Sequence, residues 1–204
     1  MVKKSPDSSV AAPTDSLAGR EIVVGVCGGI SAYKTAALVS RLVQSGAGVT
    51  VAMTKAAQRF VTALTFESLT ARQVFTSPWK AASYHDPQHL RLTEAADLFI
   101  LAPATANMIG KIAHGLADDL VSTMVMSTDC PVLLAPAMNT RMWENKMVQA
   151  NVQTLAKAGY PMVGPGEGWL ACRTVGAGRM AEPDDIFAAA VRLLQNSKPK
   201  SETH

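Results

Sequence analysis

The sequence predicts an α/β fold in a single domain, built on a parallel sheet whose strands are buried on both faces. Short apolar runs, such as residues 21–27 and 97–103, end at glycine or proline, which is typical of strands buried on both faces. Between such runs lie segments whose apolar residues recur at helical spacing. Strands that alternate with helices indicate a parallel sheet.

The first two strands and the helix between them form the clearest unit. The strand at 21–27 is followed by a helix within residues 30–46 and a strand at 49–54. Gly46 stands where the C-terminal cap of that helix is expected. Because the connection is long enough for the crossover that parallel strands require, we expect a right-handed βαβ unit.

The same alternation continues to the end of the chain. After the second apolar run we expect a helical segment at 105–127, a strand at 131–139 and a helix that runs to about Lys157. A short strand at 160–164 precedes a glycine-rich loop. Residues 182–194 form the last helix, with acidic residues in its first turn, where the helix dipole favours them.

Composition bounds the size and class of the protein. With 204 residues, of which 48% are hydrophobic, the chain can bury a substantial core. We expect one folded domain at 20–195, with disordered polar tails at 1–19 and 196–204. The net charge of +3 is too small and too evenly spread to indicate nucleic-acid binding, although it suits a small anionic ligand.

Cysteine usage and hydropathy indicate the compartment. Cys27, Cys130 and Cys172 show no paired spacing, which argues against a disulfide framework and for a reducing environment. No apolar run near the start has the length that a signal peptide needs, and none elsewhere has the length that a membrane helix needs. We therefore expect a cytoplasmic location and no membrane partner.

The turn after the first strand favours a phosphate ligand. Gly28 and Gly29 let the backbone approach a ligand, and the helix that follows offers free amides to an anion. The spacing is not that of a dinucleotide site, and the second strand ends at Met53 and Thr54 with no acidic residue for a ribose. A mononucleotide is favoured over NAD. A tight turn with a helix cap remains the structural alternative.

Polar residues also follow two later strands. Thr105 is suited to cap the next helix, and Asn107 has the donor and acceptor needed to read a flat heteroaromatic ring. Asn139 stands just past another strand, where it either caps a helix or binds a ligand. Since ligands bind beyond the carboxyl ends of parallel strands, three polar strand ends favour one shared site.

The histidines do not predict a metal site. His85 and His89 are four residues apart, but Pro87 lies between them and no third ligand is near. His114 is expected at a helix end, next to a glycine. His89 precedes a buried strand, where an acid or base role is open to it.

Four motifs together resemble one family. GGISAYK at 28–34, PATAN at 103–107, PAMNTRMWEN at 136–145 and ACRTVGAGRM at 171–180 are similar to motifs of the homo-oligomeric flavin-containing cysteine decarboxylases. The likeness is greatest to the phosphopantothenoylcysteine decarboxylases of coenzyme A biosynthesis, and it extends over residues 21–194.

The resemblance implies an FMN enzyme whose α/β fold is a Rossmann-like, flavodoxin-like parallel sheet in three layers, with helices on both faces. Its expected reaction is the decarboxylation of 4'-phospho-N-pantothenoylcysteine to 4'-phosphopantetheine. The flavin oxidises the cysteine end to a thioaldehyde, CO2 leaves, and the resulting enethiolate is reduced again. The family assembles as trimers or as dodecamers of trimers. Many bacterial relatives carry a ligase domain; here we expect a separate phosphopantothenate–cysteine ligase. Decarboxylation of peptidyl cysteine and a non-catalytic FMN-binding regulatory subunit are the alternatives.

The resemblance also assigns residues. It implies that His89 is catalytic and that Cys172 donates a proton, which requires a protonated thiol. Asn139, Met142 and Ala171 bind substrate, Asn139 through the departing carboxylate. The FMN-binding residues are implied to be Gly28, Gly29, Ile30, Thr54, Phe66, Thr105, Ala106, Asn107, Met108 and Ala137.

One departure from the family concerns the loop that acts as its lid. The family has Gly-Asp after the cysteine, whereas Arg173 and Thr174 stand here. We expect altered kinetics from this change and a retained activity.

Overall fold

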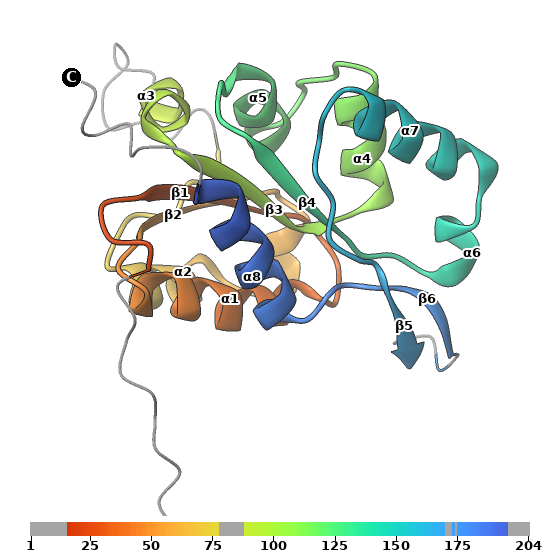
Figure 1. Cartoon of the computed structure of the whole chain (residues 1–204), viewed down its shortest axis with the longest axis horizontal. Coiled ribbons are helices and arrows are strands. Elements are labelled where there is room, and N and C mark those ends of the chain that lie inside the picture. The colour runs from red at the N-terminus through yellow and green to blue at the C-terminus, as the bar shows by residue number, and fades with distance from the viewer. Residues whose placement is uncertain (1–15, 78–87, 170–172, 174, 196–204) are drawn as a thin grey trace, which may run out of the picture.

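A four-stranded parallel sheet forms the centre of the molecule (Figure 1). The structure is a computed structural model that describes residues 16–77, 88–169, 173 and 175–195. The strand order is β2-β1-β3-β4. The strands are β1 (Glu21–Val26), β2 (Gly48–Met53), β3 (Leu98–Ala104) and β4 (Val132–Pro136). The predicted α/β class with a parallel sheet is confirmed.

The strands are buried on both faces, as their continuous apolar runs predict. Val24 of β1 lies between Val51 of β2 and Ile100 of β3, and all three side chains are buried. Buried side chains form two core clusters, so that alternate residues of one strand, such as Val23 and Val24, belong to different clusters. This alternation places one core on each side of the sheet.

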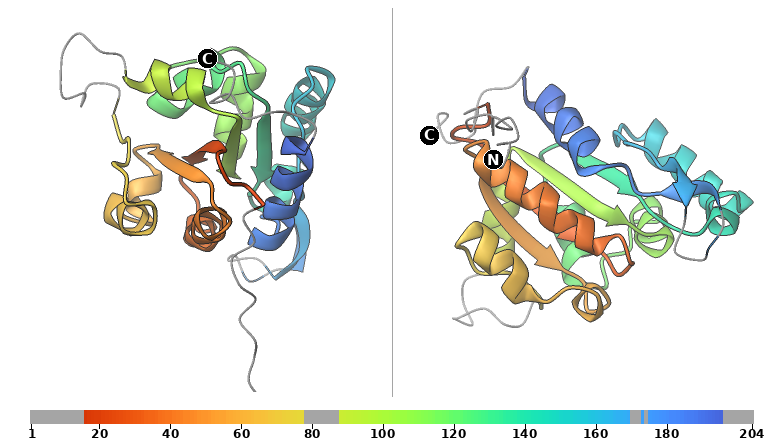
Figure 2. Two further views of the ribbon diagram at one scale, coloured as in Figure 1. Left: turned by 60° about the vertical axis from the view of Figure 1, so that its left-hand side comes forward. Right: turned by 90° about the horizontal axis from the view of Figure 1, so that it is seen from below.

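Helices cover both faces (Figures 1 and 2). One layer holds α1 (Ala32–Gln44), α2 (Ala63–Thr70) and α8 (Pro183–Leu194), with α1 packed between the other two. The opposite layer consists of α3 (Gln88–Ala95), α4 (Ala106–Ala113), α5 (Leu120–Ser127) and α7 (Lys146–Lys157). Two short elements complete the set, η1 (Ala57–Arg59) and α6 (Thr140–Trp143).

Some elements differ from the sequence prediction. The helical segment expected at 105–127 is two helices, because α4 ends at His114 and Gly115, whose φ is +67°, and Asp119 starts α5 through a capping box with Ser122. The strand expected at 160–164 is reduced to one bridge between Met162 and Leu134 of β4.

The glycine-rich loop contains a hairpin that the sequence did not predict. Strands β5 (Gly166–Trp169) and β6 (Val175–Arg179) pair antiparallel and project beside α6 (Figure 1). Within each of the two strands every second residue is glycine from Gly166 to Gly168 and from Gly176 to Gly178, so the strands lack the alternating apolar side chains that identify a half-buried strand. Helices α2 and α3 were also not predicted.

The folded part of the chain starts before residue 20. Leu17 is buried in the core, and its backbone N–H donates to the carbonyl of Ser45 at 2.9 Å. Part of the stretch expected as a disordered tail is therefore folded, while 196–204 lies outside the described residues. Within the described ranges, no helix has both the length and the hydropathy to cross a membrane.

Candidate active site

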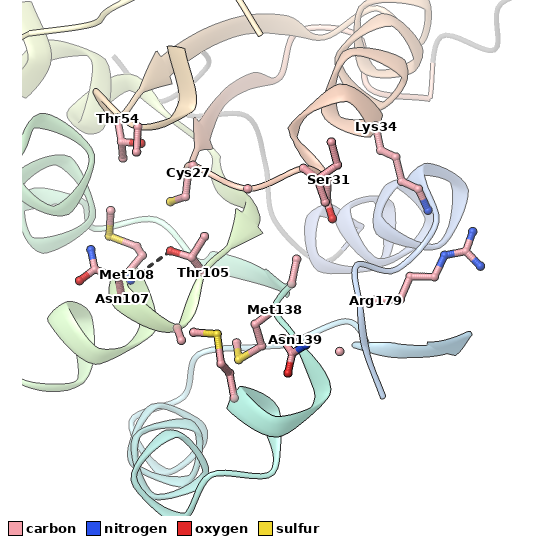
Figure 3. A pocket seen from close by; sticks show the side chains of 18 of the residues that line it. Cys27, Ser31, Lys34, Thr54, Thr105, Asn107, Met108, Met138, Asn139 and Arg179 are labelled. Carbon is pink, nitrogen blue, oxygen red and sulfur yellow. Dashed lines mark hydrogen bonds between the residues drawn. The ribbon is translucent and has the colours of Figure 1, made fainter. Parts of the chain in front are cut away.

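A cavity of about 890 Å³ lies at the carboxyl edge of the sheet (Figure 3). Its walls come from the segments that follow all four strands and from the β5–β6 hairpin. The strand order reverses between β1 and β3, which places the cavity at the topological switch point, where doubly wound sheets bind their ligands. The volume matches that of small-molecule sites.

The glycine turn after β1 forms one wall, and its two glycines play different roles. A Cβ at Gly28 would overlap Ala56, so this glycine permits two chain segments to pack. A Cβ at Gly29 would meet nothing closer than 3.8 Å. At Gly28 the alternative of a tightly packed turn therefore holds.

The start of α1 supports an anion site at the same wall. Ser31 is the N-cap residue, but its side chain makes no capping hydrogen bond. The N–H groups of Ala32 and Lys34 donate to the Gly29 and Ser31 carbonyls at 3.0 Å, but without a side-chain cap the positive end of the helix dipole stays open to the cavity. Gly28, Gly29, Ile30 and Ser31 all line the cavity, which suits a phosphate of the ligand.

Cys27 and Thr54 lie where β1 and β2 end. The Thr54 hydroxyl accepts a hydrogen bond from the Ala57 N–H at 3.1 Å, which fixes its rotamer at the cavity wall. The Cys27 side chain is 1% exposed. Burial raises the pKa of the Cys27 thiol to about 12, although the Thr105 backbone opposes the shift. Cys27 is therefore a neutral thiol, and sequence reasoning did not assign it to the site.

The segment after β3 supplies the opposite wall. Thr105 caps α4, as predicted, by accepting from the Met108 N–H at 3.4 Å (Figure 3). Ala106, Asn107 and Met108 follow in the first turn of α4 and also line the cavity. In this view Asn107 lies across the cavity from Lys34 and Arg179, so the amide and the two cations occupy different ends.

Asn139 is a helix cap, one of the two alternatives that the sequence left open, and it also lies at the cavity wall. Its side chain caps α6 by accepting from the Arg141 N–H at 2.8 Å, and it also lines the cavity with Ala137 and Met142. The hairpin fixes this segment, because the Met138 N–H donates to the Gly178 carbonyl at 2.9 Å. Asn139 is thus held between the end of β4 and β6.

Two charged clusters contribute residues to the cavity wall. The Lys34 ammonium donates to both carboxylate oxygens of Glu182, at 2.9 and 3.1 Å, and Arg179 pairs with the same carboxylate at 2.7 Å. The hydrogen bond from Lys34 holds the pKa of Glu182 below its usual range, against a smaller effect of burial. Two cations share one anion, so this cluster carries a net positive charge.

The second cluster is centred on Lys111. Its ammonium lies 2.6 Å from Asp118 and 2.6 Å from Asp119, the residue that caps α5. Burial opposes the charge of Lys111, but the two carboxylates outweigh burial and raise its pKa. Lys111 is compensated here, in contrast with Lys34 and Arg179.

The structure brings together most of the predicted site residues. Those that line the cavity are Gly28, Gly29, Ile30, Thr54, Thr105, Ala106, Asn107, Met108, Ala137, Asn139 and Met142. Phe66 does not line it; it is fully buried in α2 within the core. The His89 side chain, Ala171 and Cys172 lie outside the described residues, so their roles stay predictions.

Several cavity residues were not singled out from the sequence: Cys27, Tyr33, Lys34, Lys111, Trp169 and Arg179. The signal for Tyr33 and Lys34 was available, because both lie one helical turn after the glycine turn. Trp169 and Arg179 depend on the hairpin, which has no strong sequence pattern. In the described ranges, no group of three or more potential metal ligands is found.

Comparison with known proteins identifies the family. A family model described as Flavoprotein matches residues 10–195. The chain belongs to the Flavoprotein family. The coenzyme A biosynthesis bifunctional protein CoaBC of Bacillus subtilis is 45% identical over 174 residues, which are 85% of this chain and 43% of that protein. CoaBC of Escherichia coli K12 is 46% identical over 176 residues, with 86% and 43% covered. This flavoprotein chain thus spans less than half the length of these curated relatives.

Solved structures agree with this assignment. A cysteine-to-serine mutant of PPC decarboxylase, complexed with pantothenoylaminoethenethiol, is 31% identical with a TM-score of 0.77, covering 87% of this chain and 99% of that chain. The FMN-dependent cysteine decarboxylase SpaF is 30% identical with a TM-score of 0.75, covering 86% and 96%. The FMN-binding protein AtHal3 is 28% identical with a TM-score of 0.75, covering 88% and 99%. The family resemblance inferred from the four motifs is confirmed.

Proposed function

We propose that this flavoprotein is an FMN-dependent carboxy-lyase that converts 4'-phospho-N-pantothenoylcysteine to 4'-phosphopantetheine in coenzyme A biosynthesis. The observation that carries the proposal is the convergence of four separate chain segments on one cavity. Eleven residues that the family resemblance assigned to flavin and substrate lie at its wall. The likeness to a solved PPC decarboxylase over 99% of that chain supports the same reaction.

The residues at the cavity wall suit FMN. The uncapped start of α1 and the hydroxyl of Thr54 suit a phosphate, and the Asn107 amide suits the edge of a flavin ring. Bound there, FMN would accept two electrons from the cysteine end of the substrate and return them after CO2 has left. Met108 and Ala137 supply an apolar wall, which excludes water from the reacting end.

Asn139 is placed to hold the substrate carboxylate. A neutral amide binds the carboxylate without stabilising its charge as strongly as a cation would, so loss of CO2 is not opposed. Lys34 and Arg179 lie across the cavity from Asn107 (Figure 3). These two cations give their own side of the cavity a positive charge, which suits a phosphorylated substrate. His89 would take the thiol proton, and Cys172 would supply the last proton to the product.

The remaining proposals concern assembly and partners. We place the protein in the cytoplasm, as a homotrimer or a dodecamer of trimers. Its substrate would come from a reaction that joins cysteine to phosphopantothenate, catalysed by a phosphopantothenate–cysteine ligase. The name of the bifunctional relatives, which are longer than this chain, is consistent with two linked activities in one pathway.

Anaerobic incubation of the FMN-loaded protein with phosphopantothenoylcysteine tests the reaction. We expect release of CO2 and formation of 4'-phosphopantetheine. In Cys172→Ser an oxidised, decarboxylated product should accumulate, and His89→Asn should stop before CO2 release. A protein that binds FMN but releases no CO2 would refute the proposal. Turnover of a peptide ending in cysteine, without turnover of phosphopantothenoylcysteine, would favour the peptidyl alternative.

A matched pair of variants separates the two roles of Asn139. Asn145 caps α7 in the same way, accepting from the Met147 N–H at 2.9 Å, but it does not line the cavity. Each Asn→Ala change should cost about 1 kcal/mol of stability through the lost cap. Only Asn139→Ala should also lower kcat/KM, by about a hundredfold. Equal turnover of the two variants would remove Asn139 from the mechanism.

A further inference from the structure

The cavity rim gathers exposed apolar side chains. Among the described residues, ten large hydrophobic side chains are exposed, and four of them line this one cavity: Ile30, Tyr33, Met142 and Trp169. Large apolar groups that gather at a concave surface mark a place where a ligand or partner binds. Tyr33, 61% exposed, and Trp169, 66% exposed, have no role in the mechanism above.

The two aromatic residues come from different walls. Tyr33 lies in the first turn of α1, and Trp169 ends strand β5, opposite Val175 of β6. Neither the Tyr33 hydroxyl nor the Trp169 indole N–H has a hydrogen-bond partner in the part of the chain that the structure describes. Each side chain therefore offers a ligand an apolar face and an available donor.

The proposed substrate has a middle part that fits such groups. Between its reacting cysteine and its distal phosphate lies the pantothenoyl arm, with a branched hydrocarbon segment and two amides. The cavity wall already has polar residues suited to the charged groups of the substrate, Asn139 for the carboxylate and Lys34 with Arg179 for the phosphate. What remains at the rim is aromatic, and it complements an uncharged arm.

We propose that Tyr33 and Trp169 bind the pantothenoyl arm and are specificity-determining residues, which favour this substrate over peptides that end in cysteine. The inference rests on the proposed function. The aromatic faces pack on the branched hydrocarbon segment, and the hydroxyl and indole N–H donate to amide carbonyls. Since these contacts lie away from the reacting atoms, they contribute to binding in the ground state and the transition state alike.

Steady-state kinetics of the FMN-loaded protein tests this role. Tyr33→Ala and Trp169→Ala should each raise KM for phosphopantothenoylcysteine by about tenfold, with kcat within about twofold of wild type. Trp169→Phe should keep most of the affinity, because it retains an aromatic face. For a peptide ending in cysteine, kcat/KM should not change, so the preference between the two substrates falls about tenfold.

Two control variants replace side chains that are exposed, as Tyr33 and Trp169 are, but that do not line the cavity. Val175→Ala removes an exposed side chain from the same hairpin, and Leu64→Ala removes one from α2. Both should behave as wild type. Unchanged KM in Tyr33→Ala and Trp169→Ala would overturn the inference. An equal rise in Val175→Ala would overturn it as well, because the effect would then belong to the hairpin fold.

Two further readouts distinguish a role in substrate binding from a role in assembly or in FMN binding. Sedimentation should show the wild-type oligomer for both aromatic variants; dissociation would assign these side chains to contacts between copies and overturn the inference. Flavin absorbance should show full FMN occupancy. If wild type itself does not turn over phosphopantothenoylcysteine, the proposed function fails and this inference fails with it. If wild type turns over and the variants match it, this inference alone fails.

Discussion

Replacement of Gly178 by alanine tests how the hairpin positions Asn139. Gly178 has φ of +122°, and a Cβ there would lie well inside 3.0 Å of the Met138 carbonyl oxygen. Its own carbonyl accepts the Met138 N–H at 2.9 Å. Alanine must therefore move β6 away from the segment that carries Asn139.

The magnitude follows from two terms. A strained backbone region costs about 1–3 kcal/mol for a residue with a Cβ. Opening the bond between Met138 and Gly178 removes about 1 kcal/mol more. The hairpin strands contribute no side chain to either core cluster, so the resulting loss of about 2–4 kcal/mol should appear as local opening and not as global unfolding.

Hydrogen exchange and turnover together provide the assay. In Gly178→Ala the hydrogen of the Met138 amide should exchange faster, by the factor that corresponds to a loss of about 2–4 kcal/mol. The value of kcat/KM should fall about ten- to a hundredfold, because Asn139 is misplaced. Gly166→Ala is the matched control, since its Cβ would meet only the Arg179 carbonyl oxygen at 3.9 Å. Wild-type protection of Met138 together with wild-type turnover in Gly178→Ala would refute the reasoning.

Three other predictions concern titration and backbone strain. With a pKa near 12, the Cys27 thiol should react with iodoacetamide at about pH 8 roughly a thousandfold slower than an unfolded thiol. The contribution of this thiol to stability should be lost only as pH rises above about 9. Fast labelling of the native protein, measured by mass spectrometry, would contradict the raised pKa. The lowered pKa of Glu182 gives stability that is present above its ordinary pKa and is lost as pH falls, so the free energy of unfolding in urea should lack this acid-dependent part in Glu182→Gln. Because the ion pairs are half-exposed, the difference should be below about 1 kcal/mol. The same dependence of unfolding free energy on pH in wild type and variant would count against this prediction. Arg173 has φ of +64°, so Arg173→Gly should stabilise the hairpin by about 1 kcal/mol in hydrogen exchange while Arg173→Ala does not; equal effects would exclude backbone strain as the cause.

The sheet and most of the cavity follow from local sequence signals. The strands were predictable because each is a continuous apolar run that ends in glycine, proline or a polar residue. Parallel strands place their carboxyl ends at one edge, so the sequence alone was enough to expect the turn at Gly28 and Gly29, Thr105 and Asn139 near each other. The cap that Thr105 makes for α4 was also predictable, because it depends on neighbours in sequence.

The hairpin and the charged clusters depend on contacts that sequence spacing does not encode. Arg179 reaches Glu182 within one turn of chain, but the pairing of Glu182 with Lys34 joins residues 148 positions apart. Strand β6 can lie close to the Met138 carbonyl oxygen only because Gly178 has no Cβ. Neither contact leaves a periodic pattern. Arg173 is an intermediate case: its backbone is left-handed, a conformation that glycine adopts without strain, which agrees with the glycine that the resemblance implies at that position.

The helices that begin at the cavity show where the fold leaves a local rule unmet. Helices α4, α5 and α6 are capped by their own side chains, Thr105, Asp119 and Asn139, which all line the cavity. Helix α1 starts with Ser31, a residue type well suited to capping, and yet it has no side-chain cap. A helix of 13 residues could carry such a cap at little cost, and an uncapped start beside a cavity is more useful as a site for a bound anion. Departures from local consistency are expected at functional sites, and the start of α1 is therefore the position at the cavity where the proposed FMN phosphate would replace a missing intramolecular contact.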